Sequence, residues 1–155
     1  MRVTGLLMLL LLSQPNLIQA QPDSLEKSFT QLIQAKTLKC VWEKGMVSEW
    51  KEGLAVVNKS KMKEFTFDAI DLKKGTARFI ANAGAGDVIV LTSAAGIVFI
   101  EQTGQGNYSF TTVYSQKADD MEFRETFYAV HSRHMNLFLS TPLSSQYYGK
   151  CMIWE

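Results

Sequence analysis

Four polar side chains stand out because they occur on segments that otherwise alternate like β-strands. They are a carboxylate, a hydroxyl, an imidazole and a guanidinium, supplied by Glu101, Thr112, His131 and Arg133. Each shares a strand face with aromatic or aliphatic neighbours, because strand side chains alternate with a period of two. If their strands are adjacent, the four groups converge near one end of a barrel or sheet and would hold a small polar ligand. The alternative is a buried network in which Glu101 pairs with Arg133 and His131 is hydrogen-bonded.

The same residues bear on acid–base and metal chemistry. His131 and Glu101 would serve as acid and base if both lay within about 3 Å of a substrate atom. His131 and His134 are three residues apart, so on a strand they point to opposite faces and are poor joint ligands. A zinc site needs three or four convergent ligands, and the chain has two histidines in all. We therefore assign no catalytic residue, no metal and no cofactor from the sequence.

The chain contains two cysteines, Cys40 and Cys151. In an oxidising compartment an isolated even pair is most simply one disulfide. The bond would close a loop of about 110 residues, and the chain-entropy estimate gives it roughly 4–5 kcal/mol. Bonded cysteines must have Cα atoms within about 7 Å of each other. Since Cys40 falls in the first predicted strand and Cys151 in the last, these two strands should be neighbours or pack face to face.

Short β-strands are the elements that must position these groups. From Phe65 to Tyr114, segments rich in β-branched and aromatic residues alternate with glycine-containing turns. Connections this short favour antiparallel neighbours. The strands predicted here are Phe65–Leu72, Ala77–Ala81, Val88–Thr92, Ile97–Thr103 and Tyr108–Tyr114.

The flanking segments add one helix and several strands. Asp23–Ala35 carries apolar residues at helical spacing and is predicted to form a short helix. Before the central region we expect strands at Thr37–Glu43, Met46–Lys51 and Leu54–Asn58, with a turn at Lys44-Gly45. After it we expect, in order, a loop, a strand, a second loop and a final strand: Ser115–Glu122, Phe123–His134, Leu137–Tyr147 and Gly149–Trp154.

These elements predict an all-β fold. The expected architecture is an antiparallel meander barrel of about eight or nine strands with a short N-terminal helix. A meander whose first and last strands are joined closes into a barrel, and closure removes exposed sheet edges. The alternative is a two-sheet sandwich with the disulfide between the sheets.

Met1–Ala20 has the features of a secretory signal peptide. Arg2 is basic, Gly5–Leu12 is an apolar run, and Ala20 is a small residue before the expected cut. The apolar run is too short to cross about 30 Å of hydrocarbon. We therefore predict cleavage after Ala20, leaving residues 21–155 as a single secreted or periplasmic domain without a membrane span.

The charge of the mature chain excludes one class of partner. Removal of Arg2 with the signal peptide leaves 15 basic side chains against 15 acidic ones. No basic stripe or charged tail is present, so we do not expect nucleic acid as a partner.

Three segments resemble those of small secreted bacterial proteins of uncharacterised function. They are Phe99–Gly104, Ala129–His134 and Ser145–Cys151. The resemblance covers most of the mature chain and implies no activity. The expected architecture also resembles lipocalin-like meander barrels. The lipocalin Gly-x-Trp near the first strand is absent, because neither Trp42 nor Trp50 has a glycine two residues before it.

Three hypotheses for function follow from these features. The leading hypothesis is non-catalytic binding of a small molecule in the barrel or at its mouth, by the four polar residues. A second is a protein–protein interaction module with a filled barrel, working through the loops Ser115–Glu122 and Leu137–Tyr147. A third is an enzyme that uses His131 and Glu101 as acid and base.

Overall fold

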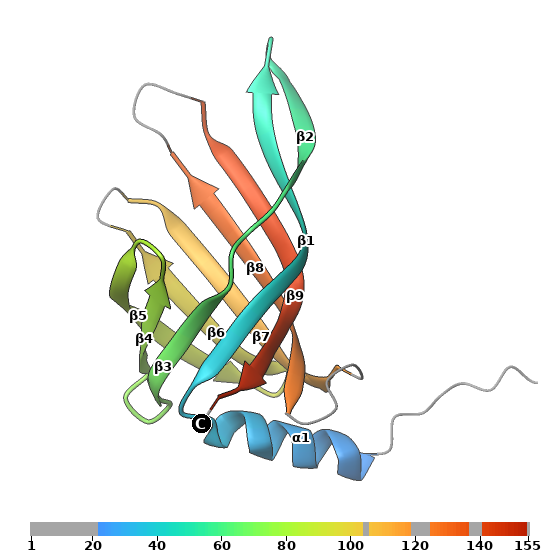
Figure 1. The fold of residues 1–155 in the computed structure, drawn as a ribbon, viewed down its shortest axis with the longest axis vertical. Coiled ribbons are helices and arrows are strands. Elements are labelled where there is room, and N and C mark those ends of the chain that lie inside the picture. Colours follow the sequence, from blue (N-terminus) through green and yellow to red (C-terminus); the bar gives the residue numbers. More distant parts are fainter. Residues whose placement is uncertain (1–21, 104–105, 119–124, 137–140, 155) are drawn as a thin grey trace, which may run out of the picture.

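The computed structural model describes residues 22–103, 106–118, 125–136 and 141–154 (Figure 1). In sequence order the elements of this part are α1 (Pro22–Gln34), β1 (Leu38–Lys51), β2 (Leu54–Ser60), β3 (Phe65–Asp71), β4 (Thr76–Ala81), β5 (Gly84–Ser93), β6 (Gly96–Gln102), β7 (Tyr108–Lys117), β8 (Thr126–Met135) and β9 (Leu143–Ile153). The predicted signal peptide, residues 1–20, lies outside the described residues, so it stays a prediction.

The strands close into an antiparallel barrel. β3 to β9 follow one another around the ring, and β1 lies between β3 and β9. The seam between β1 and β9 is long, because pairing runs from Leu38 opposite Ile153 to Ser48 opposite Ser144. β2 pairs with the far half of β1 and projects beyond the ring (Figure 1). The predicted meander barrel with one short helix is therefore confirmed, and the chain does not form the alternative sandwich.

The disulfide lies in this seam. Cys40 and Cys151 are bonded, their Cα atoms are 4.0 Å apart, and they face each other directly in the register of β1 and β9. The predicted pairing and the predicted meeting of the first and last strands are confirmed. The bond links positions 111 residues apart, so it joins the two ends of the meander.

β1 is one continuous strand, so the prediction of two strands with a turn at Lys44-Gly45 was wrong. Its register with β9 shifts by one residue between Trp42 and Lys44, which is a β-bulge. Gly45 lies inside the strand rather than in a turn. The ring of Tyr147 occupies the place where a Cβ at this position would be. An aromatic ring over a strand glycine restores the packing that the missing side chain forgoes.

Two predicted loops are partly strand. β9 begins at Leu143, so the end of the predicted loop Leu137–Tyr147 belongs to it. Pro142 stands just before this strand, where it removes no hydrogen bond from the strand interior. β7 runs to Lys117, so the start of the predicted loop Ser115–Glu122 is also strand. Residues 119–122 and 137–140 of these loops lie outside the described part of the chain.

A second bulge lies in β3. Its register with β4 shifts between Asp68 and Asp71. Strict alternation along the predicted strand Phe65–Leu72 would place Ala69 on the face of Phe67, but Ala69 is exposed and has a φ of +49°. Ile70 is buried in the core instead. The sequence of a short apolar strand does not reveal a bulge, because a bulge changes which residues face inward but not the composition of the strand.

α1 covers one end of the barrel (Figure 1), and buried side chains fill that end. Leu32 of α1 is fully buried and belongs to the same cluster as Leu38, Ile97 and Phe127. Ser28 of α1 donates a hydrogen bond to the carbonyl of Ser115, 2.7 Å away. The predicted helix is thus confirmed, and it closes one end of the barrel.

Candidate functional site

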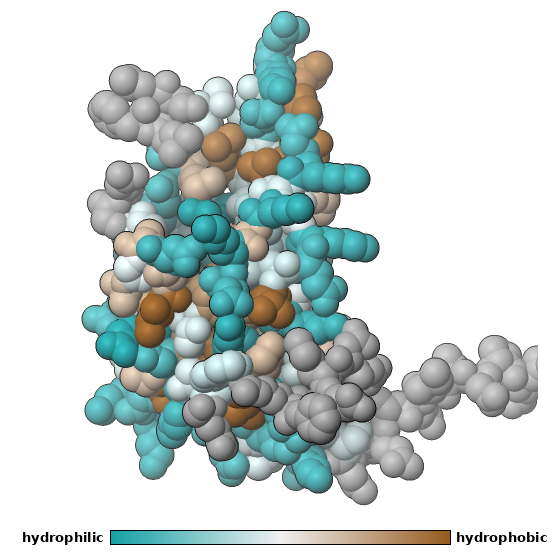
Figure 2. Space-filling view, in the orientation of Figure 1, coloured by the Kyte–Doolittle hydropathy of each residue, from teal (hydrophilic) through white to brown (hydrophobic). Residues whose placement is uncertain are grey.

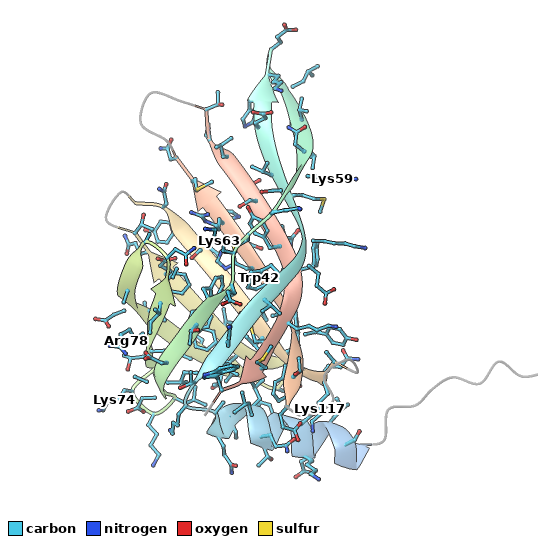
Figure 3. The ribbon with its side chains drawn as sticks, in the orientation of Figure 1. Trp42, Lys59, Lys63, Lys74, Arg78 and Lys117 are labelled. Carbon is cyan, nitrogen blue, oxygen red and sulfur yellow. A yellow bond between two sulfur atoms is a disulfide. The ribbon has the colours of Figure 1, made fainter. Side chains whose placement is uncertain are left out.

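The end of the barrel opposite α1 contains a cavity of about 390 Å³, which we call the mouth cavity. This volume falls in the range of small-molecule pockets, roughly 300–1,000 Å³. Its apolar walls include Met62, Phe65, Phe79, Ala81 and Met135, and its polar groups include Glu101, Ser109, His131 and Arg133. Lys63 also lines it and lies nearer the open end than Trp42, which is inside the barrel (Figure 3).

Strand register brings the polar groups together. Ser109 of β7 pairs with Glu101 of β6 on one side and with Arg133 of β8 on the other. Directly paired residues project from the same face of a sheet. One step deeper, Thr111 pairs with His131. The structure therefore gathers three of the four predicted site residues, namely Glu101, His131 and Arg133.

Thr112 does not join them, so its predicted place beside Glu101 was wrong. Side chains alternate along β7, and Thr111 is the buried residue of the pair, with 2 % of its surface exposed. The prediction counted Thr112 among the polar residues that share a face with aromatic neighbours, here Phe110 and Tyr114, but Tyr114 is exposed, so this face is the outer one. The interior beside β7 already contains Phe99 of the neighbouring strand β6, which pairs with Thr111 and is stacked on Phe67. A barrel interior has room for a limited side-chain volume, so β7 contributes its small residues there.

One hydrogen bond and three aromatic rings fix the position of His131. It is 2 % exposed, and its Nδ1 lies 2.7 Å from the hydroxyl of Thr111. Its ring centroid lies 5.2 Å from that of Phe65, 5.6 Å from Trp42 and 6.1 Å from Tyr147. These aromatic contacts fix the imidazole at the floor of the mouth cavity.

The surroundings keep this imidazole neutral. Burial lowers the pKa of His131 from its ordinary value of 6.5 to about 3, and the positive charge of Arg133 acts in the same direction. At neutral pH His131 is therefore an uncharged hydrogen-bonding group, without the second ring proton that an imidazolium would give as a general acid. A general acid or base works best with a pKa near the working pH.

The charged groups of the mouth are unevenly paired. Glu101 accepts a hydrogen bond from the Ser109 hydroxyl at 2.7 Å. Glu64, at the rim, forms an ion pair of 2.9 Å with Lys39. Arg133 is half-buried and has no ion pair or hydrogen bond within the described part of the chain. Of the alternative buried network, the hydrogen-bonded His131 is confirmed, whereas Glu101 does not pair with Arg133.

Two more buried polar atoms were not predicted from the sequence as part of the site. The indole nitrogen of Trp42 and the hydroxyl of Ser145 are buried, and neither has a hydrogen-bond partner among the described residues. Ser145 pairs with Arg133 in the register of β8 and β9. Buried polar groups are nearly always hydrogen-bonded, so these two need an explanation. Ser109, Thr111 and Ser145 share one signal, a small hydroxyl residue whose two chain neighbours are less buried than it is.

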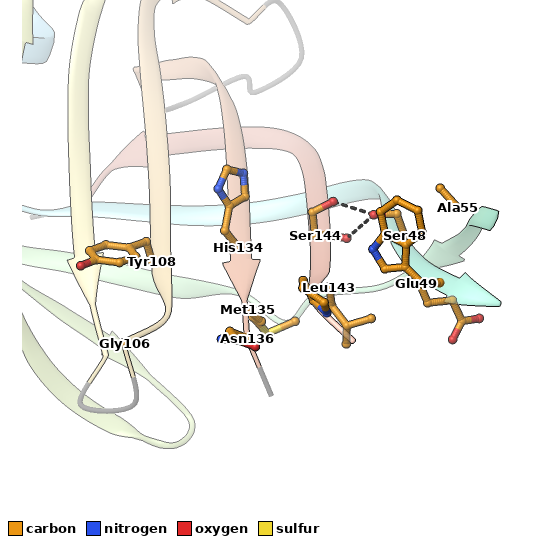
Figure 4. Close-up of a pocket in the computed structure, with 12 residues that line it drawn as sticks. Ser48, Glu49, Ala55, Gly106, Tyr108, His134, Met135, Asn136, Leu143 and Ser144 are labelled. Carbon is orange, nitrogen blue, oxygen red and sulfur yellow. Dashed lines mark hydrogen bonds between the residues drawn. The ribbon is translucent and has the colours of Figure 1, made fainter. Parts of the chain in front are cut away.

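A second depression lies at the same end of the molecule. It measures about 430 Å³, and its lining includes Ser48, Tyr108, His134 and Ser144 (Figure 4). The hydroxyls of Ser48 and Ser144 lie 2.6 Å apart and hydrogen-bond to each other. Most of the side chains named here are exposed, and the two serine hydroxyls are already paired with each other, so this site is a weaker candidate than the mouth cavity.

Apolar side chains also remain uncovered near the tip of the β1–β2 hairpin, where Figure 2 shows them beside hydrophilic ones. Leu54 and Val57 of β2 are 71 % and 62 % exposed. Single exposed apolar residues are normal on protein surfaces. We assign no ligand to this surface.

Neither a metal-ligand cluster, nor a membrane-spanning helix, nor a similar known protein identifies the site within the described residues. Within the described ranges, no three His, Cys, Asp or Glu side chains come together as metal ligands. The same residues contain no helix that is long and apolar enough to cross a membrane. No protein-family model matches the chain, and no curated protein matches its sequence.

Proposed function

We propose that this protein binds a small molecule without transforming it, in the mouth cavity of its barrel. The observation that supports this most directly is the cavity itself, about 390 Å³, at the end that α1 leaves open. Met62, Phe65, Phe79 and Met135 form an apolar part of its lining, and polar groups from three adjacent strands converge on the cavity beside them. Ligand sites typically combine such apolar walls with a small number of placed polar groups.

The arrangement favours binding over acid–base catalysis. His131 already hydrogen-bonds to Thr111, and its pKa of about 3 leaves it uncharged at neutral pH. It is therefore suited to shape the floor and to accept or donate one hydrogen bond. The cavity likewise favours binding over an interaction module whose barrel would be filled throughout.

The proposed compartment is outside the cytoplasm, either secreted or periplasmic. The Cys40–Cys151 bond supports it, because disulfides persist in oxidising compartments. The predicted signal peptide, Met1–Ala20, would deliver the chain there.

Native mass spectrometry tests the binding proposal. The mature protein is purified from its own compartment without refolding, and we expect a small-molecule adduct. Ala81→Phe should remove the adduct, because Ala81 lines the mouth cavity. Ala55→Phe is the matched control, since Ala55 is exposed and lines only the outer depression. An adduct that survives Ala81→Phe in a folded protein would place the ligand elsewhere and refute the proposal.

A further inference from the structure

We infer that the ligand of the mouth cavity is a small apolar carboxylic acid whose carboxylate pairs with the guanidinium of Arg133. This inference rests on the proposed function and adds the chemical class of the ligand. It follows from three properties of the described residues: an unpaired cation inside the barrel, the charge balance of the mouth, and the chemistry of the walls.

Arg133 is the anchor. It projects into the interior at the level of Ser109 and Ser145, is half-buried, and has no carboxylate partner in the described ranges. A partly desolvated charge without a counter-charge is unfavourable, so a binding anion gains more here than at an exposed arginine. The planar guanidinium offers two parallel N–H donors that match the two oxygens of a carboxylate.

The neighbouring carboxylate does not cancel this charge. Glu101 lies two strands away from Arg133, with Ser109 between them, and the Ser109 hydroxyl donates to Glu101 rather than bridging to the guanidinium. Lys63 lines the same cavity and has no ion pair among the described residues, whereas Glu64 is paired with Lys39. With Glu64 neutralised by Lys39, which lies outside the cavity lining, the charges left around the mouth are those of Arg133, Lys63 and Glu101. Their sum is plus one, which favours a monoanion.

The walls select an apolar body. Phe65 and Phe79 form an edge-to-face pair with centroids 4.8 Å apart, and Met62 and Met135 line the cavity with them. Aromatic rings and thioethers gain from covering apolar groups, and methionine adapts to their shape. A small inorganic anion would satisfy Arg133 but leave these walls uncovered, so the carboxylate should be attached to a hydrocarbon or aromatic part.

Three probes with one skeleton test the class of ligand. They are 3-phenylpropionate, 3-phenylpropanamide and 3-phenylpropylamine, which differ in charge but hardly in size. Binding to the mature protein, emptied by exhaustive dialysis, is measured by isothermal titration calorimetry at neutral pH. We expect the acid to bind about ten-fold more tightly than the amide, and the amine to bind most weakly.

Two variants assign the effect to its residue. Arg133→Gln should erase the preference for the acid, while Glu101→Gln should tighten acid binding about three-fold by removing a nearby like charge. Circular dichroism checks that each variant is folded. If Arg133→Gln fails to fold, Arg133→Lys and the comparison of acid with amide on the wild-type protein still decide the matter.

The outcomes separate this inference from the proposed function. Equal affinity for acid and amide, or a preference for the amine, overturns the carboxylic-acid inference while leaving a binding cavity in place. An acid preference that persists unchanged in folded Arg133→Gln overturns the role of Arg133. Absence of binding by all three probes overturns the inference, and the proposed function then stands only if the adduct displaced by Ala81→Phe is present.

Discussion

Acidification from about pH 7 to about pH 5 should destabilise this protein through His131. The imidazole is 2 % exposed, and burial lowers its pKa to about 3 from the ordinary value of 6.5. In this interval the unfolded chain binds a proton that the folded protein does not. A group whose pKa is lowered on folding in this way favours the unfolded state as the pH falls below 6.5.

The size of the effect follows from linkage. Each pH unit between the two pKa values costs about 1.4 kcal/mol of the free energy of unfolding. Lowering the pH from 7 to 5 should therefore remove about 2 kcal/mol, with most of the loss below pH 6.5. Asp68, Asp71 and Glu125 have pKa values lowered by their cationic and hydrogen-bonding partners, so their stabilising contributions are lost at more acidic pH. The loss of unfolding free energy between pH 6.5 and pH 5 is therefore attributed to the buried imidazole of His131.

Urea unfolding at several pH values measures this slope. His131→Gln keeps a hydrogen-bonding side chain without a basic nitrogen, so its stability should be nearly flat between pH 6.5 and 5. His134→Gln is the matched control, because His134 is exposed on the outer face, and it should retain the wild-type slope. A flat wild-type profile, or an unchanged slope in folded His131→Gln, would refute the reasoning.

Three further predictions test the packing. Thr111→Val should cost about 1–3 kcal/mol in urea unfolding because it removes the hydroxyl bonded to the imidazole, whereas Thr112→Val should change stability by less than about 0.5 kcal/mol; equal costs would contradict the assigned faces of β7. Gly149→Ala should cost more than about 2 kcal/mol, because its Cβ would collide with the carbonyl oxygen of Val41, and a neutral result in the same assay would refute that contact. Ala69→Gly should raise stability by about 0.5–1 kcal/mol by relieving the φ of +49°, and a lower thermal midpoint would show that no strain is relieved.

Much of the fold was predictable because it depends on local pattern. The five strands expected between Phe65 and Tyr114 correspond to β3–β7, since β-branched and aromatic runs separated by glycine turns leave few alternatives. The disulfide was predictable because Cys40 and Cys151 are the whole cysteine complement. The bulges in β1 and β3 were missed, because an inserted residue changes the facing of a strand without changing its composition.

The candidate site was predictable in part. Glu101, His131 and Arg133 lie on strands whose inward face was assigned correctly, because each carries large apolar residues on that face. For β7 the same argument selected Thr112 over Thr111, since it assumed that aromatic residues face inward. Which face of β7 points inward depends on how much of the interior the side chains of the other strands already fill. That filled volume is known only once the barrel is closed.

The sequence by itself determined the order of the strands from β3 to β9, the antiparallel sense and the joining of the two ends, because turn lengths, side-chain alternation and a single cysteine pair are local or pairwise constraints. The tertiary structure decided that β1 is one strand beside β3 and that β2 lies outside the ring. Only the tertiary structure decided which end of the barrel is open, which hydroxyls face its interior, and that Arg133 has no counter-charge in the described residues. Those properties depend on where α1 docks and on how side chains from distant strands share one volume. How these side chains fill the interior depends on all of the strands together, so the alternation pattern of any single strand does not predict it.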